Sequence, residues 1–127
     1  MGKDSLFLIE KGFTESKQKY YCPDSARLEG VITYYPSLNY SMDIKRIPFE
    51  KPRSEIVDMF GEQYQGCPLL VIRVSSGLRI FGYDDADSIS SNPSKIPNKL
   101  KGILFSNNME FIDEYLCSIY GVSKPNP

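Results

Sequence analysis

The sequence predicts an α/β domain in which strands and helices alternate along the chain. Three observations lead to this class: short apolar runs typical of buried strands, apolar residues at helical spacing between them, and prolines or glycines at the boundaries. A chain of 127 residues, 41% of them hydrophobic, is long enough for one domain with its own core. We therefore expect residues 1–127 to form a single domain.

The first predicted elements are a strand and a helix. Residues 6–9, LFLI, indicate a buried strand, and the polar EKGFTESKQ that follows them indicates a loop. A helix is expected to begin at or near Cys22, because Pro23 suits a first helical turn, and to stop at Pro36. Its apolar positions fall at helical spacing and are Leu28, Val31, Ile32 and Tyr35.

A second strand and a second helix follow. Apolar and polar residues alternate before Pro48, which predicts a half-buried strand containing Tyr40, Met42 and Ile44. Pro52 then opens a helix that ends at Gly61, a C-terminal cap. The apolar side of this helix consists of Ile56, Val57 and Phe60.

The second half of the chain predicts an antiparallel hairpin and a last helix. Residues 69–74 form an apolar strand interrupted only by Arg73, and the SSG turn at 75–77 leads into a strand at 78–81. The polar stretch at about 83–101 is expected to be a surface insertion, with a lid as the alternative. Asn107 and Glu110 have the spacing of a capping box at the start of the last helix, which ends before Gly121.

Composition excludes several classes of function. Fifteen basic and sixteen acidic residues nearly balance, so a nucleic-acid partner is not expected. No apolar run approaches the roughly 20 residues that span a bilayer, and no signal peptide is evident, so we expect a cytoplasmic protein without a membrane partner. The absence of histidine excludes Ser-His-Asp and Cys-His catalysis. Three cysteines without a CxxC pair predict no metal site.

The order of elements and two motifs together resemble a known fold. CPDS stands at the start of the first helix, and in GCPLLVI a proline immediately precedes the third strand. The chain resembles the glutaredoxin-like branch of the thioredoxin superfamily, which includes the N-terminal domains of glutathione transferases. More closely, it resembles an uncharacterised bacterial family with this fold. The matching residues are Tyr21, Cys22, Glu29, Gly30, Gln65, Pro68, Leu69, Leu70 and Val71. The resemblance implies a central mixed four-stranded sheet flanked by three or more helices.

Cys22 carries the candidate chemistry. A thiolate at a helix N-terminus is stabilised by backbone N–H groups and by the helix dipole, which favours a nucleophile. Asp24, in the same first turn, opposes this through its negative charge, and Lys17, Lys19 and Arg27 could offset it. Two interpretations stay open here: a reactive thiol, or a small residue buried under a turn.

The resemblance implies roles for three further residues. Ser25 stands where dithiol relatives have a second cysteine, so the implied route is that of monothiol glutaredoxins, in which glutathione resolves a mixed disulfide on Cys22. Pro68 would be a cis-proline whose preceding backbone pairs with bound peptide or glutathione. Cys67 would then lie near Cys22, as a resolving thiol with alpha carbons roughly 4.4 to 6.8 Å apart. The alternative for Cys67 is a small apolar filler.

The start of the last helix bears on glutathione binding. Transferases use an acidic residue followed by Ser there, and this chain has Asn108 and Met109, so the hydroxyl is missing. Free backbone N–H groups at that helix start could still hold a carboxylate. The candidate substrate-binding residues are Tyr21, Pro23, Ser25, Cys67, Pro68 and Asn108.

Two classes of function follow from these residues. The first is a thiol–disulfide oxidoreductase that uses Cys22 on a thiol or disulfide substrate, with glutathione as the one ligand suggested and no other cofactor. The second is a non-catalytic binding module that keeps the cis-proline groove for an extended peptide. Ser25 and the altered pair at Asn108 favour the second class.

Overall fold

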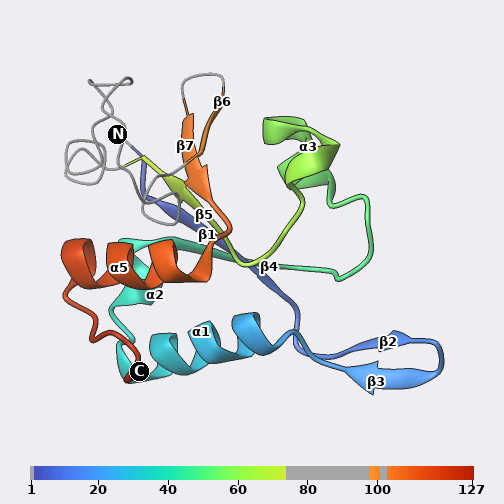
Figure 1. The fold of residues 1–127 in the computed structure, drawn as a ribbon, viewed down its shortest axis with the longest axis horizontal. Helices are drawn as coiled ribbons and strands as arrows, with labels where there is room; N and C mark the ends of the chain where they lie inside the picture. Colours follow the sequence, from blue (N-terminus) through green and yellow to red (C-terminus); the bar gives the residue numbers. More distant parts are fainter. Residues whose placement is uncertain (1, 74–97, 101–102) are drawn as a thin grey trace.

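The computed structural model describes residues 2–73, 98–100 and 103–127 (Figure 1). Its strands are β1 (Ser5–Ile9), β2 (Phe13–Glu15), β3 (Gln18–Tyr20), β4 (Asp43–Ile47), β5 (Leu69–Ile72), β6 (Asn98–Leu100) and β7 (Ile103–Ser106). Its α-helices are α1 (Pro23–Tyr34), α2 (Leu38–Ser41), α3 (Ser54–Phe60) and α5 (Met109–Tyr120), and a short 3-10 helix covers Glu62–Tyr64. None of the described helices is long and apolar enough to cross a membrane.

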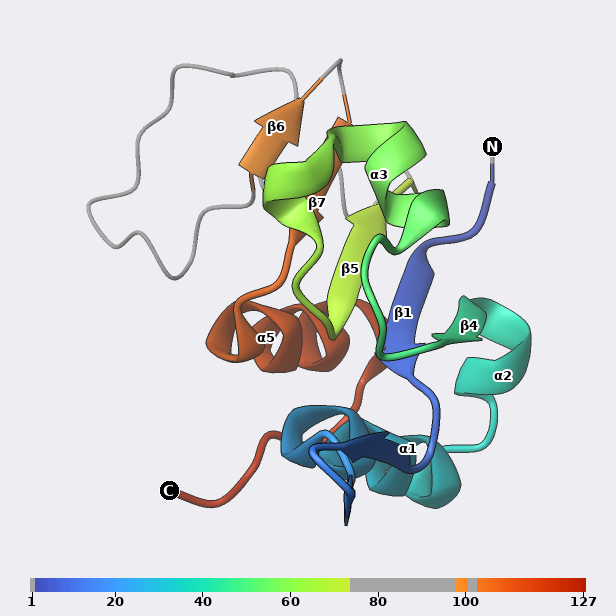
Figure 2. The same cartoon turned by 90° about the vertical axis from the view of Figure 1, so that its right-hand side faces the viewer.

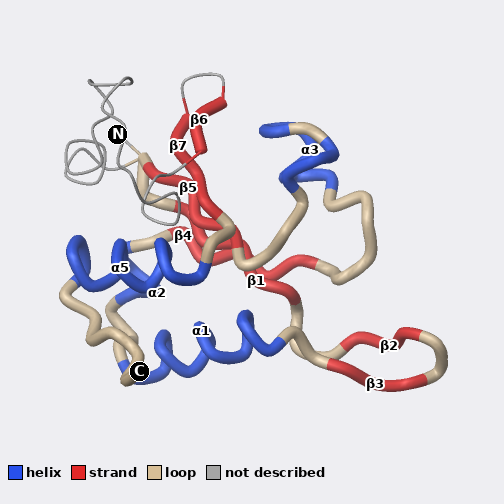
Figure 3. Tube along the Cα trace, viewed as in Figure 1, coloured by secondary structure: helices blue, strands red, loops and turns tan. Residues whose placement is uncertain are grey.

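The centre of the structure is a mixed sheet of five described strands in the order β4-β1-β5-β7-β6. Strand β1 pairs with β4 in parallel and with β5 in antiparallel orientation. Strands β5 and β7, and β7 and β6, are also antiparallel. Figure 3 shows these strands side by side, with the separate β2–β3 hairpin projecting away from them.

Helices cover both faces of the sheet. Helices α1 and α5 lie on one face and α3 lies on the other (Figure 2). Leu6 and Leu8 of β1 belong to the core cluster that contains α1 and α5 residues, whereas Phe7 belongs to the cluster with Ile56 and Phe60 of α3. Successive side chains of a strand point to opposite faces, so a strand covered on both sides is apolar throughout. This is why LFLI and LLVI are uninterrupted apolar runs.

The sheet differs from the expected four-stranded one at its antiparallel end. The partner of β5 is β7, at Ile103–Ser106, which the sequence analysis did not predict. The strand expected at 78–81 lies outside the described residues. The last three described residues of the expected insertion, Asn98–Leu100, form β6, a fifth strand. Residues 83–97 of that insertion also lie outside the described part of the chain.

The stretch expected to be a loop after β1 contains the β2–β3 hairpin. Its turn residues, Ser16 and Lys17, both have positive φ values, 51° and 66°. Tight hairpin turns require such values, and Asn-Gly or Asp-Gly is their usual sequence signal. Because this turn is built from Ser and Lys, the sequence carried no hairpin signal.

Three predicted boundaries were wrong by a few residues. Tyr40 lies in α2 and is 79% exposed, so the strand begins at Asp43 rather than before it. Helix α3 begins at Ser54, two residues after Pro52. Helix α5 is capped by Asn108 and not by Asn107, because the Asn108 side chain accepts the Phe111 N–H.

Candidate functional site

Cys22 is the residue at which α1 begins, as predicted. It occupies the N-cap position with extended backbone angles, and its carbonyl oxygen accepts the Ala26 N–H at 2.9 Å. Pro23 is the first helical residue. The Cys22 side chain makes no capping hydrogen bond and is partly exposed. The sulfur is therefore placed where a negative charge is favoured by the helix dipole, with Asp24 as an opposing charge in the first turn.

Ser25 does not point outward from the helix toward a substrate. It is 2% exposed, and its Oγ accepts the backbone N–H of Ile9, at the end of β1, at 3.0 Å. This bond ties the first turn of α1 to the sheet. Tyr21 is 66% exposed, and Tyr21, Cys22 and Ser25 all border a hollow of about 330 Å³. The substrate roles of Tyr21 and Ser25 stay predictions.

Cys67 and Pro68 lie immediately before β5. The peptide bond between them is cis, as is the Lys51–Pro52 bond. Pro68 is buried and Cys67 is partly buried against the α3-side cluster. Burial raises the pKa of the Cys67 thiol to about 11, the Arg53 guanidinium lowers it, and the charge of Cys22 raises it further. Both thiols are free.

Arg53 is a site residue that the sequence analysis missed. Its guanidinium donates to the Gln65 carbonyl oxygen at 2.6 Å and to the Phe49 carbonyl oxygen at 2.7 and 3.1 Å. The buried Gln65 side chain accepts the Arg53 N–H at 2.7 Å and donates to the Glu62 carbonyl oxygen. These bonds join the loop after β4 to the loop before Cys67. The local sequence pattern does not show that this arginine will bond to backbone carbonyl oxygens of two loops.

Aromatic rings pack beside the same two loops. Phe13 of the hairpin stacks on Phe49 with ring centroids 3.8 Å apart and an interplanar angle of 6°. Phe13 also contacts Tyr20, at 6.2 Å between centroids, and Arg53 lies 5.5 Å from the centroid of the Phe49 ring. The hairpin is thus held against the loop that carries Arg53, and β3 leads within two residues to Cys22.

The start of α5 lies beside the Cys67 loop. A Cβ atom on Gly66 would come within 2.6 Å of Asn107 Nδ2, so the backbone before Cys67 passes close to that side chain. The exposed Asn108 uses its Oδ1 to accept the Phe111 N–H at 2.9 Å. One of the N–H groups expected to hold a substrate carboxylate therefore already has a partner.

Cys22 stands at the start of α1, Cys67 stands shortly before β5, and Cys117 lies on α5. The closeness of Cys22 and Cys67 that the resemblance implies stays a prediction. Within residues 2–73, 98–100 and 103–127, no three metal-binding side chains form a group. What the arrangement offers chemically is a partly exposed thiol at a helix start, a second thiol that burial keeps protonated, and an arginine beside the second one.

Comparison with known proteins gives a family and nothing finer. Neither the curated proteins nor the solved structures contain a match to this chain. A family model described as a protein of unknown function, DUF3088, matches residues 3–124, from before β1 to beyond α5. Because this match covers nearly the whole sequence, the chain belongs to the DUF3088 family.

Proposed function

We propose that the protein is a thioredoxin-like thiol–disulfide oxidoreductase that acts through Cys22. The strand order β4-β1-β5-β7, with β1 parallel to β4 and antiparallel to β5, supports the thioredoxin-like comparison, and β6 is an addition to it. The observation that carries the proposal is the position of the partly exposed Cys22 at the start of α1, in a fold that also places a second thiol, Cys67, immediately before Pro68. Such a protein suits a reducing compartment such as the cytoplasm, in which thiols stay reduced.

The proposed first step is attack of the Cys22 thiolate on one sulfur of a substrate disulfide. A new S–S bond forms between Cys22 and that sulfur, the substrate S–S bond breaks, and the departing thiolate takes a proton from water. A second thiolate then attacks the substrate-derived sulfur of this mixed disulfide, the bond from that sulfur to Cys22 breaks, and Cys22 leaves as its thiolate. Over the cycle one substrate sulfur is reduced to a thiol, the incoming thiol is oxidised into the new disulfide, and Cys22 returns to its starting state.

The environment of Cys67 indicates that an external thiol such as glutathione, rather than Cys67, resolves the mixed disulfide on Cys22. With a pKa of about 11, the Cys67 thiol is almost entirely protonated at neutral pH, and the thiolate is the attacking form. Ser25 is bonded to Ile9 and has no thiol to offer. These two facts support the monothiol route over the one that uses Cys67 as resolving thiol.

A non-catalytic binding module is the second candidate. It is favoured by the same two facts, because a dithiol mechanism has no reactive second thiol here, and by the use of Asn108 Oδ1 in capping α5. In this case the cis-Pro68 backbone would pair with an extended peptide while Cys22 stayed chemically silent.

The experiment treats the reduced protein with glutathione disulfide and locates the modified cysteine by mass spectrometry of a non-reduced digest. We expect glutathione on Cys22, a loss of modification in Cys22→Ser, and release by added glutathione. Cys117→Ser is the matched control and should leave the rate unchanged. Cys67→Ser should also leave it unchanged, because the external thiol resolves the intermediate.

Two results would count against this function. If Cys22 is modified no faster than Cys117, the result would contradict the oxidoreductase function and favour the non-catalytic binding module. An intramolecular Cys22–Cys67 disulfide as the main product would replace the monothiol route by the dithiol one.

A further inference from the structure

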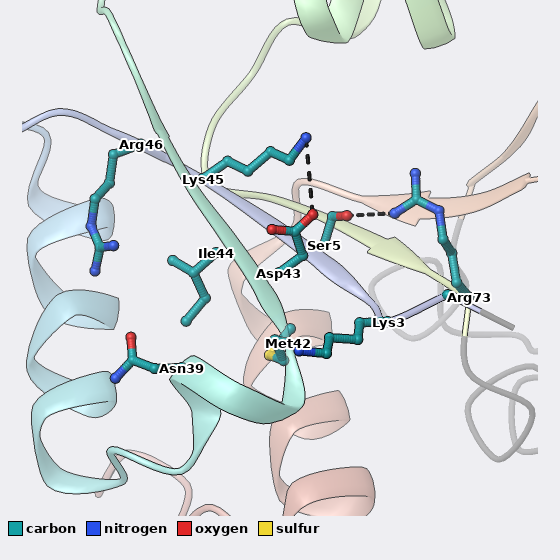
Figure 4. Close-up of a pocket in the computed structure, with 10 residues that line it drawn as sticks. Lys3, Ser5, Asn39, Met42, Asp43, Ile44, Lys45, Arg46 and Arg73 are labelled. Atoms are coloured by element: carbon teal, nitrogen blue, oxygen red, sulfur yellow. Dashed lines mark hydrogen bonds and ion pairs between the residues drawn. The ribbon is translucent and has the colours of Figure 1, made fainter.

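A second surface feature lies away from the thiols, along the free edge of β4. A hollow of about 600 Å³ runs beside this strand and reaches the residues before β1, the end of α2 and Arg73 after β5 (Figure 4). Strand β4 is the last strand on its side of the described sheet. The hollow therefore follows an edge of the described sheet rather than a gap between helices.

The backbone of β4 presents hydrogen-bonding groups to this hollow. Asp43 donates its N–H to the Asp4 carbonyl oxygen at 2.8 Å, and the Ile47 carbonyl oxygen accepts the Glu10 N–H at 2.8 Å, so both face β1. Alternate residues of a strand present these groups to opposite sides, so those of Ile44 and Arg46 face outward. The edge thus offers two donors and two acceptors at the spacing of a strand.

The side chains around the hollow are mostly cationic. Lys3, Lys45, Arg46 and Arg73 line it, against the single carboxylate of Asp43. Arg46 is held by Glu29 and Lys45 by Glu55, each at 2.7 Å, and Lys45 also lies 3.9 Å from Asp43. In the part of the chain that the structure describes, Lys3 and Arg73 have no carboxylate within ion-pair distance.

These cations come from different segments: Lys45 and Arg46 from β4, Lys3 from before β1, and Arg73 from the residue after β5, which β1 separates from β4. In Figure 4 the Arg73 side chain bonds to Ser5, the Lys3 side chain lies near Met42, and the Arg46 side chain points away from both. An extended ligand with several negative charges would reach more than one.

We propose that the β4 edge binds an extended acidic peptide segment, which adds a strand beside Asp43–Ile47 and places its carboxylates near Lys3 and Arg73. Backbone pairing supplies the affinity in such strand addition, and side-chain charge supplies the selection. A second copy of this chain suits the edge less well. Antiparallel pairing of β4 with β4 about its central residue would set Lys45 of one copy directly against Lys45 of the other.

The test uses a fluorescent five-residue peptide of alternating Glu and Val, the length of β4, and measures binding by fluorescence anisotropy. We expect binding that weakens as salt is added. A peptide N-methylated at the residues that face β4 should bind about tenfold more weakly, since it loses two backbone hydrogen bonds and keeps its charge.

Two substitutions test the location. Lys3→Glu should weaken binding severalfold, whereas Lys19→Glu, an equal change of charge on the β2–β3 hairpin, should leave it unaltered. Equal binding of the N-methylated peptide would overturn strand addition, and equal effects of the two substitutions would overturn the β4 edge as its place. If the protein forms a dimer that persists when the peptide is added, a second copy of the chain occupies the β4 edge. That result would also overturn the proposal.

Discussion

Single residues set the chemistry of the candidate site, and the balance at Cys67 shows how. Burial disfavours its thiolate, while the nearby Arg53 guanidinium favours it. Burial has the larger effect, because the pKa is raised from its ordinary value of 9.0 to about 11. The Arg53 guanidinium also donates hydrogen bonds to the Phe49 and Gln65 carbonyl oxygens and so holds their two loops together. Its charge acts on the Cys67 thiol, whereas its hydrogen bonds act on the loops.

These two roles of Arg53 can be separated by alkylation of Cys67 at increasing pH, followed by mass spectrometry of the digest. In the native chain the midpoint should lie at about 11. Arg53→Gln removes the positive charge and should move the midpoint upward, whereas Arg53→Lys should keep it close to the native value.

The direction of the shift is the informative part of that experiment. If either substitution merely loosens the loops, Cys67 becomes hydrated and its midpoint falls toward 9.0. A fall in Arg53→Gln would therefore contradict an electrostatic role and leave only the bracing role.

At the scale of elements, the end of α5 shows how one residue stops a helix. Gly121 has left-handed angles, φ 71° and ψ 20°, and its N–H bonds back to the Cys117 and Leu116 carbonyl oxygens. A Cβ atom there would meet nothing within 4 Å, so a side chain would cost backbone strain and no clash. Gly30, inside α1, also has open space around its Cβ position but needs no left-handed backbone.

This pair predicts opposite effects of one substitution. Gly121→Ala should lower the free energy of unfolding by about 1 kcal/mol, the cost of a left-handed alanine. Gly30→Ala should raise it by up to about 1 kcal/mol through helix propensity. Urea unfolding measures both. Effects of the same sign in both variants would show that side-chain contacts, and not backbone conformation, decide the outcome at these positions.

Elements with a strong local signal were predictable from the sequence, and those without one were not. LFLI and LLVI are apolar on both faces, and Pro23, Gly61 and Gly121 mark helix boundaries by fixed backbone preferences. Strand β7 is as long as β5 but has only three apolar residues, ILF, before Ser106, so its apolar run is shorter than LFLI or LLVI and gives a weaker strand signal. The β2–β3 hairpin is stabilised by the stacking of Phe13 on Phe49, a contact between distant segments.

The candidate site divides in the same way. The start of α1 at Cys22 and the entry of β5 after Pro68 were predictable, because each depends on neighbouring residues in the chain. The burial of Ser25 against Ile9 and the bonds of Arg53 depend on how α1 and the β4–α3 loop pack on the sheet. Local sequence patterns do not carry that information.

At the scale of the whole molecule, Asp4 joins segments from both ends of the chain. It is completely buried, its Oδ2 accepts bonds from the Tyr115 and Tyr120 hydroxyls, and its Oδ1 accepts the Arg73 N–H at 2.6 Å. Its carbonyl oxygen accepts the N–H of Asp43. Burial and the neighbouring carboxylate raise the pKa of both tyrosines, so their hydroxyls stay donors at neutral pH.

Removal of this carboxylate should destabilise the protein strongly. Asp4→Ala leaves buried donors without their acceptor, at about 1–3 kcal/mol for each, so we expect a loss of about 3 kcal/mol or more in the free energy of unfolding. Asp4→Asn keeps one acceptor oxygen and should lose less. Thermal and urea unfolding of both variants test this, and equal losses would show that the charge, and not the accepted bonds, matters at this position.

The two core clusters on opposite faces of the sheet have a consequence for the thiols. Cys22 precedes α1, which packs in one cluster, while Cys67 packs against the other. The separation of the two sulfurs thus depends on how the two helical layers sit across the sheet. A chemical cross-linker of fixed length between Cys22 and Cys67 would measure that arrangement, and its yield would report any sliding of one helical layer over the other.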